Sequence, residues 1–373
     1  MGTISSYTFT VSTSSPAAGI SPTSLDFGIQ SMGTTSPSQA VTVTNTGTGT
    51  LTISGISLSS PQFSQTSNCA SLGAGQSCTV TVTFNPSVVA GPINTMANVN
   101  GTLTITHNGL GSPGLASLEG VAEKSLVSHY YRAVLRRAPE ASGIDFWQGE
   151  AERVALLGAN VNEVWFALAQ TFFSSPEYKN FNRSNTAYLT DLYKTFFNRD
   201  PDADGLAYWG NLLAQGMPRD VVLVEFMLSS EFRNFAQSIF GNTAVRAEID
   251  VATDFYRGIL SRAPDSGGFG YWVGRFRTAQ CQGGNAVNAA ANDISSGFAN
   301  SPEYAARIRS NAEFVADMYN AFLRRGGDLG GVQFWIGQLD SGAMTRDQVR
   351  LAFIGTPEFQ ARVQAVINAG CQS

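Results

Sequence analysis

Basic residues are absent from the first third of the sequence. All 23 lysines and arginines among the 373 residues follow position 122, and residues 1–122 carry only Asp26 and Glu119 as acids. This step in composition, near residues 120–124, indicates a domain boundary. The formal net charge of −5 argues against nucleic acid as a partner, because binding to a polyanion requires clustered cations.

Long apolar runs and catalytic histidine patterns are also lacking. No run approaches the roughly 20 apolar residues of a membrane-spanning helix, so no membrane span is expected. Neither of the two histidines, His107 and His129, lies in a recognisable serine, cysteine or aspartate context, so we do not expect an enzyme. The first residues lack the basic start and apolar core of a signal peptide, which fits either a cytosolic chain or a trimmed secreted one.

Cysteine is scarce, and no cysteine pair has a metal-binding spacing. The four cysteines allow three pairings. Pairing each cysteine within its own domain gives Cys69–Cys78, which flank a glycine-containing turn, and Cys281–Cys371. Disulfides imply an oxidising compartment, so we expect an extracellular or cell-surface location, with the cytosol as the alternative.

A motif of eleven residues, running from an arginine to a tryptophan, recurs four times after residue 122. We call it the corner motif. Each copy has an acid at its fourth position, glycine at its seventh and an aromatic residue before the tryptophan, and the copies recur about every 63 residues, which is the signature of a repeat architecture. The copies begin and end at Arg137 and Trp147, Arg199 and Trp209, Arg262 and Trp272, and Arg325 and Trp335.

The residue types of the second copy predict a helix–turn–helix corner. Apolar residues at helical spacing precede Arg199, and Pro201 is expected to end that helix. Asp202 is suited to cap the next helix, and Gly205 to adopt whatever backbone angles the corner needs.

A second signature, Ser or Thr followed by Pro and Glu, closes each repeat; Ser230 replaces the proline in the second repeat. It is a strong helix start. A recurring arginine and a recurring glutamate indicate an internal ion pair that locks helices together, since a guanidinium bonds a carboxylate and helix carbonyls at once. An anion or glycan site at the arginines is the alternative. The glutamates are Glu177, Glu231, Glu303 and Glu358.

The paired aromatic residues at the end of each corner motif are expected to lie mainly in the core. A stacking platform for sugars is the alternative. For Trp165, which lies outside the motifs, the sequence gives no expectation.

Three acids in the second corner motif match the opening of a calcium loop. Asp200, Asp202 and Asp204 alternate and are followed by Gly205, but the twelfth position of the loop is Asn211 instead of a bidentate glutamate. We therefore favour a capped helix corner with solvated acids and expect no cofactor, with calcium as the alternative.

The N-terminal region alternates apolar and polar residues with period two. Threonine-rich segments such as 40–44, 78–84 and 101–106 predict an antiparallel β-sandwich over residues 20–122, preceded by a strand and linker over residues 1–19. Residues 24–28, 41–47 and 68–84 resemble the choice-of-anchor D family and the abnormal-spindle/hydin-type Ig-like domains. That resemblance implies a bacterial secreted or envelope-exposed scaffold module without catalysis.

Residues 123–373 resemble the bacterial domain of unknown function 4214, through the corner motifs and their closing signatures. The same pattern is similar to that of phycobilisome linkers. The resemblance implies a secreted, surface-layer or calcium-binding repeat protein. We therefore predict a multidomain protein, an all-β Ig-like sandwich followed by an all-α array of four repeats of three or four helices each.

The favoured function is that of a non-catalytic structural protein of the bacterial surface, a filament, surface-layer or adhesin-type component that self-assembles. The alternative is a module that binds a glycan or another envelope polymer through its aromatic residues. Expected partners are further copies of the chain or other surface proteins. Residues 5–12 are predicted to complete a neighbouring copy's sandwich as an added strand, or to fold back onto their own domain.

Overall fold

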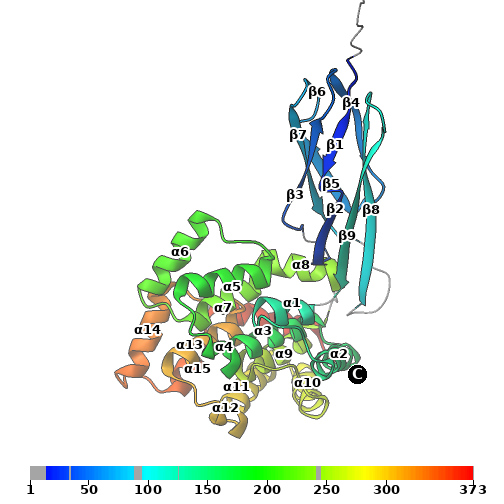
Figure 1. Cartoon of the computed structure of the whole chain (residues 1–373). Helices are drawn as coiled ribbons and strands as arrows, with labels where there is room; N and C mark the ends of the chain where they lie inside the picture. Colours follow the sequence, from blue (N-terminus) through cyan, green and yellow to red (C-terminus); the bar gives the residue numbers. More distant parts are fainter. Residues whose placement is uncertain (1–13, 33–34, 88–94, 125, 241–244, 373) are drawn as a thin grey trace, which may run out of the picture. The chain divides into compact units, whose positions relative to one another are not determined.

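The chain divides into two compact units, Met1–Ser125 and Leu126–Ser373, which we call the β-unit and the helical unit. The computed structural model describes residues 14–32, 35–87, 95–124, 126–240 and 245–372 (Figure 1). In that part of the chain, none of the helices has the length and apolar content needed to cross a membrane.

The β-unit is a sandwich of two sheets, as the sequence predicted. All neighbouring strands are antiparallel except β2 and β9, which run parallel. One sheet has the order β1 (Ala18–Ser21), β3 (Gln39–Asn45), β7 (Ser77–Phe84) and β5 (Phe63–Ser67), and the other has β2 (Ser24–Ser31), β9 (Gly114–Lys124), β8 (Thr95–His107), β4 (Leu51–Leu58) and β6 (Ser71–Leu72).

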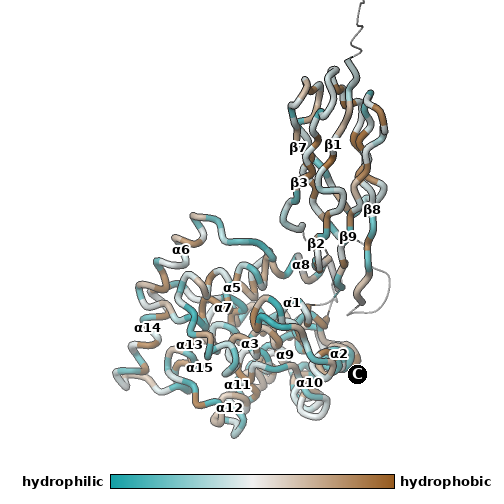
Figure 2. Tube along the Cα trace, viewed as in Figure 1, coloured by the Kyte–Doolittle hydropathy of each residue, from teal (hydrophilic) through white to brown (hydrophobic). Residues whose placement is uncertain are grey.

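Strand alternation explains how an uncharged sequence builds this sandwich. In β7, Cys78, Val80, Val82 and Phe84 are buried, while the serine and threonines between them remain partly exposed. Successive side chains of a strand point to opposite faces, so the apolar set of each sheet meets that of the other sheet. Figure 2 shows the resulting mixture of hydrophobic and hydrophilic segments along the strands.

The stretch for which a linker was predicted belongs to the sandwich. Ala18–Ser21 forms β1 and pairs with β3, and the carbonyls of Ser15 and Ala17 accept hydrogen bonds from the amides of Thr48 and Thr46, both at 2.9 Å. The Ser/Pro composition hid this strand, whose partners in β3 and in the turn after it lie far away in the sequence. Residues 5–12, which the added-strand hypothesis concerns, lie outside the described residues.

The helical unit contains four repeats of four helices, apart from the residues that are not described. Each repeat has a first helix, the corner motif, a second and third helix and a closing helix. The helices are α1 (Leu126–Ala133), α2 (Ala141–Leu156), α3 (Asn162–Ser174) and α4 (Pro176–Asn180); α5 (Asn185–Phe197), α6 (Ala203–Ala214), α7 (Arg219–Leu228) and α8 (Ser230–Phe240); α9 (Ala247–Leu260), α10 (Ser266–Gln280), α11 (Gly284–Ala299) and α12 (Pro302–Ala306); and α13 (Asn311–Met318), which continues as the π-helical turn η1 (Tyr319–Leu323), α14 (Leu329–Asp340), α15 (Arg346–Ile354) and α16 (Pro357–Ala369).

A left-handed residue, not the proline, ends the helical segment before each corner; in the first repeat a hydrogen-bonded turn lies between the end of α1 at Ala133 and the left-handed Arg136. In the second repeat α5 ends at Phe197, and Asn198 has φ of 49°, three residues before Pro201. A single left-handed residue is a common helix end. Because the helix has already ended, the corner tolerates glycine in place of proline in the fourth repeat. The four left-handed residues are Arg136, Asn198, Ser261 and Arg324.

Two disulfides form, one in each unit. Cys69 bonds to Cys78, and Cys281 bonds to Cys371, so the predicted pairing is confirmed. The second bridge ties the end of α10 to the residues after α16, which are 90 positions apart. Disulfides persist in oxidising compartments, which points to a location outside the cytoplasm.

Candidate functional site

Three aromatic rings pack together at every corner motif. In the second repeat, the ring of Phe226 lies 5.1 Å from Tyr193 and 5.2 Å from Trp209, centroid to centroid. The phenylalanine escaped the sequence analysis, although in each repeat it lies three residues before the Ser or Thr of the closing signature. The equivalent sets are Tyr131, Phe172 and Trp147; Tyr256, Phe298 and Trp272; and Tyr319, Phe353 and Trp335.

The structure brings each motif arginine to the glutamate that closes its repeat. Arg199 lies 3.4 Å from Glu231, and its guanidinium also covers the ring of Tyr193 at 4.9 Å. The other pairs are Arg137 with Glu177 at 2.7 Å, Arg262 with Glu303 at 2.5 Å and Arg325 with Glu358 at 2.9 Å.

These ion pairs lie at the surface, so they do not lock a buried core. The side chains of Arg199 and Glu231 are 43% and 54% exposed. The hydrogen bond from Arg137 lowers the pKa of Glu177, but exposed pairs of this kind contribute about 0–1 kcal/mol. The arginines mainly connect the corner to the closing helix and cover the tyrosine ring.

The corner motif requires glycine because of a close contact, and not because of an unusual backbone angle. Gly205 lies inside α6, and a Cβ atom at this position would overlap the hydroxyl of Tyr193. The same overlap with the preceding tyrosine would occur at Gly143, Gly268 and Gly331. The expectation of unusual backbone angles at Gly205 was therefore wrong, because sequence spacing does not reveal where a tyrosine hydroxyl lies.

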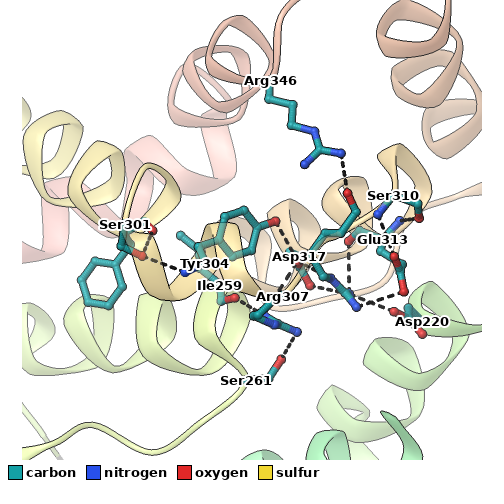
Figure 3. A network of polar contacts seen from close by, with 12 residues as sticks. Asp220, Ile259, Ser261, Ser301, Tyr304, Arg307, Ser310, Glu313, Asp317 and Arg346 are labelled. Atoms are coloured by element: carbon teal, nitrogen blue, oxygen red, sulfur yellow. Dashed lines mark hydrogen bonds and ion pairs between the residues drawn. The ribbon is translucent and has the colours of Figure 1, made fainter.

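A buried aspartate that the sequence analysis missed joins the repeats. Asp191, Asp254 and Asp317 occupy the same position before the corner motif, where the first repeat has His129. Figure 3 shows Tyr304, Arg307 and Glu313 gathered near Asp317. The sequence does contain a signal, because each aspartate lies two residues before the tyrosine that precedes its corner motif. An acid within a helical pattern, however, is indistinguishable from an ordinary surface residue.

Arginines neutralise each of these aspartates. Asp317 accepts hydrogen bonds from Arg309 at 2.8 and 2.9 Å and from the hydroxyl of Tyr304 at 2.8 Å. Burial raises the pKa of Asp317 to about 6, while Arg309 and Arg307 act in the opposite direction and favour the ionised carboxylate. Arg309 also bonds Asp220 of α7 at 2.9 Å, which links the fourth repeat to the second.

The third repeat holds the most deeply buried network. Asp254 pairs with Arg257, Arg324 and Arg362, and Arg257 is only 1% exposed. Glu163 of α3 bonds Arg257 at 2.5 Å and Arg324 at 2.9 Å, so the network reaches the first repeat. Burial lowers the pKa of Arg257 to about 10. Since each partner is already desolvated, removing one would leave a buried charge.

Two of the three acids of the calcium-like stretch, Asp200 and Asp202, have other partners. Asp202 caps α6 by accepting from the Gly205 amide at 2.7 Å and pairs with Arg199 at 3.1 Å, while Asp200 pairs with Lys194 at 2.8 Å. Among the described residues, no group of three or more His, Cys, Asp or Glu is placed to hold a metal ion. The residues around Asp204 therefore do not fit a calcium site.

Both histidines make hydrogen-bonding contacts to backbone groups. The Nε2 atom of His129 lies 2.8 Å from the carbonyl of Thr195, and Nδ1 of His107 accepts from the Gly109 amide at 3.1 Å. Trp165 is fully buried in α3.

The expectation that the paired aromatics lie in the core holds only for the tryptophans, which are buried or half-buried. The residue before each tryptophan is exposed: Phe146 by 58%, Tyr208 by 60%, Tyr271 by 57% and Phe334 by 53%. Each exposed ring meets its tryptophan edge-on, with centroids 4.7 to 5.1 Å apart. The helix turns 100° per residue, so neighbours in sequence face different surroundings.

Two hollows in the helical unit lie beside exposed tyrosines. One, of about 260 Å³, is lined by Tyr208, Trp209 and Glu225 together with the start of the fourth corner motif. In this hollow, Glu225 accepts a hydrogen bond from the Gly326 amide at 2.6 Å. The residues that line the hollow therefore also join the second repeat to the fourth. The other, of about 550 Å³, lies between α10 and α11 beside Tyr271.

The fold and the repeated corners define a modular protein with an Ig-like sandwich and an α-helical repeat array. Comparison with family models identifies both parts. Residues 18–120 match the HYDIN/CFA65/VesB-like Ig-like domain, and residues 169–236 and 295–363 match the domain of unknown function DUF4214. The chain therefore carries an Ig-like domain of the first kind and repeats of the second.

Solved structures show only distant similarity. A protein of unknown function from Porphyromonas gingivalis W83 is 17% identical, with a TM-score of 0.24, over 31% of this chain and 49% of that chain. The VesB protease of Vibrio cholerae is 21% identical, with a TM-score of 0.21, over 29% and 31%. The ASH/PapD-like domain of human CEP192 is 14% identical, with a TM-score of 0.23, over 33% and 96%.

The chain thus spans about half the length of the first of these structures and about a third of the second. A search of curated proteins found no match.

Two glycines of one helix should respond to alanine in opposite directions. Gly205→Ala places a methyl group against the Tyr193 hydroxyl and should destabilise the helical unit by about 1–3 kcal/mol. Gly210→Ala, where a Cβ meets nothing within 4 Å, should stabilise it by about 0.5–1 kcal/mol. Tryptophan fluorescence during urea unfolding measures both changes, because all five tryptophans lie in the helical unit. Stabilisation by both variants would contradict the contact.

Buried and exposed ion pairs should differ sharply in their contribution to stability. Asp254→Asn leaves the charges of Arg257, Arg324 and Arg362 without their shared carboxylate and should cost about 3–5 kcal/mol. Arg199→Ala removes an exposed pair and a ring contact and should cost about 1 kcal/mol. The same fluorescence-monitored urea titration measures both. Equal losses would show that burial does not set the contribution of these pairs.

Proposed function

We propose that the protein is a non-catalytic component of the bacterial exterior whose helical unit binds a neutral glycan of the envelope or surrounding matrix. The observation that supports this proposal is the exposed ring at the same position of all four corner motifs. Aromatic side chains provide a large, rigid apolar surface with little rotational freedom. A flat ring held in place by a tryptophan is suited to stack against the apolar face of a sugar ring.

Repetition of the exposed ring favours a polymer over a small ligand. Phe146, Tyr208, Tyr271 and Phe334 lie on the separate helices α2, α6, α10 and α14. Weak contacts at several sites on one polymer add through the effective concentration of the tethered units. The net charge of −5 disfavours an acidic polymer, so a neutral glycan fits better.

Self-assembly is the second candidate, supported by the sandwich. The four-stranded sheet ends in β1 and β5, and neither edge strand carries a charged residue. Natural proteins commonly place charges on edge strands to prevent pairing with other chains. An added strand from residues 5–12 of another copy, or contact with another surface protein, would use such an edge.

Retention by polysaccharides tests the glycan proposal. In affinity gels containing dextran or β-glucan, the full chain should migrate more slowly than in a gel without polymer, and polygalacturonate should have less effect. The quadruple variant with alanine at Phe146, Tyr208, Tyr271 and Phe334 should lose at least tenfold in affinity while keeping its far-ultraviolet circular dichroism. Leu156→Ala, which removes another exposed apolar side chain, is the control. Unchanged migration of the wild-type chain in every neutral polymer would exclude this function.

Sedimentation velocity tests self-assembly and distinguishes strand donation between copies from strand pairing within one copy. If residues 5–12 are donated between copies, the full chain should form polymers at micromolar concentration, and a chain lacking residues 1–14 should remain monomeric and folded. If the segment pairs within its own sandwich, the shortened chain should instead have a less stable β-unit. Polymers that persist without residues 1–14 would rule out strand donation.

A further inference from the structure

Helix-interior glycines without a structural reason accompany the exposed rings. Gly149, Gly274 and Gly337 follow Phe146, Tyr271 and Phe334 by three residues. A Cβ atom at each of these glycines would meet nothing within 4 Å, and none of the three has a positive φ. Glycine inside a helix is less stable than alanine, so neither packing nor backbone geometry explains these three positions.

The position of these glycines affects the adjacent ring. Side chains three and four residues apart are neighbours on a helix surface. A glycine three residues after an aromatic residue therefore leaves one flank of the ring uncovered. The uncovered flank is widest at Phe334 and Tyr271, because Gly330 and Gly267, four residues before these rings, also lack a side chain.

The hollow between α10 and α11 is lined by the uncovered ring of Tyr271. It has a volume of about 550 Å³, within the range of small-molecule sites. Apart from Tyr271, its apolar lining consists of alanine and glycine, and its polar lining includes Thr278, Gln282, Arg275 and Asp293. An apolar peptide side chain would find few carbon atoms to contact here.

One ion pair beside the ring supplies donors and acceptors in balance. The Nη2 atom of Arg275 lies 3.2 Å from Oδ2 of Asp293, and the two side chains are 39% and 55% exposed. Exposure leaves further guanidinium hydrogens and carboxylate lone pairs available to a ligand. Since the pair has no net charge, it favours a neutral ligand with hydroxyl groups over an ionic one.

We infer that the hollow beside Tyr271 is a subsite for one neutral saccharide unit, which stacks on the tyrosine and bonds Arg275 and Asp293 through its hydroxyl groups. This inference rests on the proposed glycan-binding function and locates it. Gly274 keeps the ring accessible, at a cost in helix stability.

Filling the space above the ring tests the subsite without removing the ring. Gly274→Gln adds a helix-favouring side chain, so the melting temperature should stay the same or rise, while the Kd for cellohexaose, chitohexaose or dextran should rise at least tenfold. Tyr271→Ala should weaken binding to a similar extent. Gly210→Gln, which adds the same side chain at an open glycine of α6 that is not three or four residues from an exposed ring, is the matched control and should change the Kd less than threefold. Fluorescence titration measures all four proteins, because Trp272 contacts Tyr271 at 4.7 Å.

The outcomes distinguish the subsite from the function. If the wild-type chain binds a probe and Gly274→Gln binds it equally well, the subsite is wrong and the glycan-binding function stands. If Gly337→Gln, the equivalent change beside Phe334 on α14, weakens binding and Gly274→Gln does not, the subsite lies on α14. If the wild-type chain binds none of the neutral probes, both proposals fail.

Discussion

The helical unit depends on carboxylates that are buried between its repeats. The buried Asp254 and Glu163 share Arg257 and Arg324, while the buried Asp317 shares Arg309 with the partly exposed Asp220. Each buried carboxylate is stable only when an arginine from another helix or repeat is in place, because a lone buried charge is strongly unfavourable. The networks therefore specify which helices meet, in addition to the apolar contacts that drive them together.

Repetition made the architecture predictable, and single-sequence patterns showed what each half of the chain builds. Period-two alternation identified the sandwich, and the spacing of Trp147, Trp209, Trp272 and Trp335 identified the repeats. The paired cysteines and the arginine–glutamate partners also followed from position alone. These features are local or strictly periodic, so that no knowledge of the packed structure is needed to see them.

Features that depend on packing could not be anticipated. The role of Gly205 requires the position of the Tyr193 hydroxyl, and the burial of Asp254 requires arginines from distant segments. The exposure of Tyr208 next to the half-buried Trp209 depends on the rotation of α6 against its neighbours. The sequence predicted that Pro201 ends the helix, but the left-handed backbone of Asn198 ends it three residues earlier.

The parallel pairing of β2 with β9 gives the sandwich a mechanical property. Pairing runs from Ser24 with Ser117 to Ser31 with Glu123, and β9 is the last strand before the helical unit. Tension applied between the start of β2 and the end of β9 would pull these parallel strands in opposite directions along their length. The hydrogen bonds between them would then share the load in shear and break together, whereas peeling would break them one at a time. The β2–β9 pair would therefore resist a force that enters the sandwich at β2 and leaves it at the end of β9, the last strand before the helical unit.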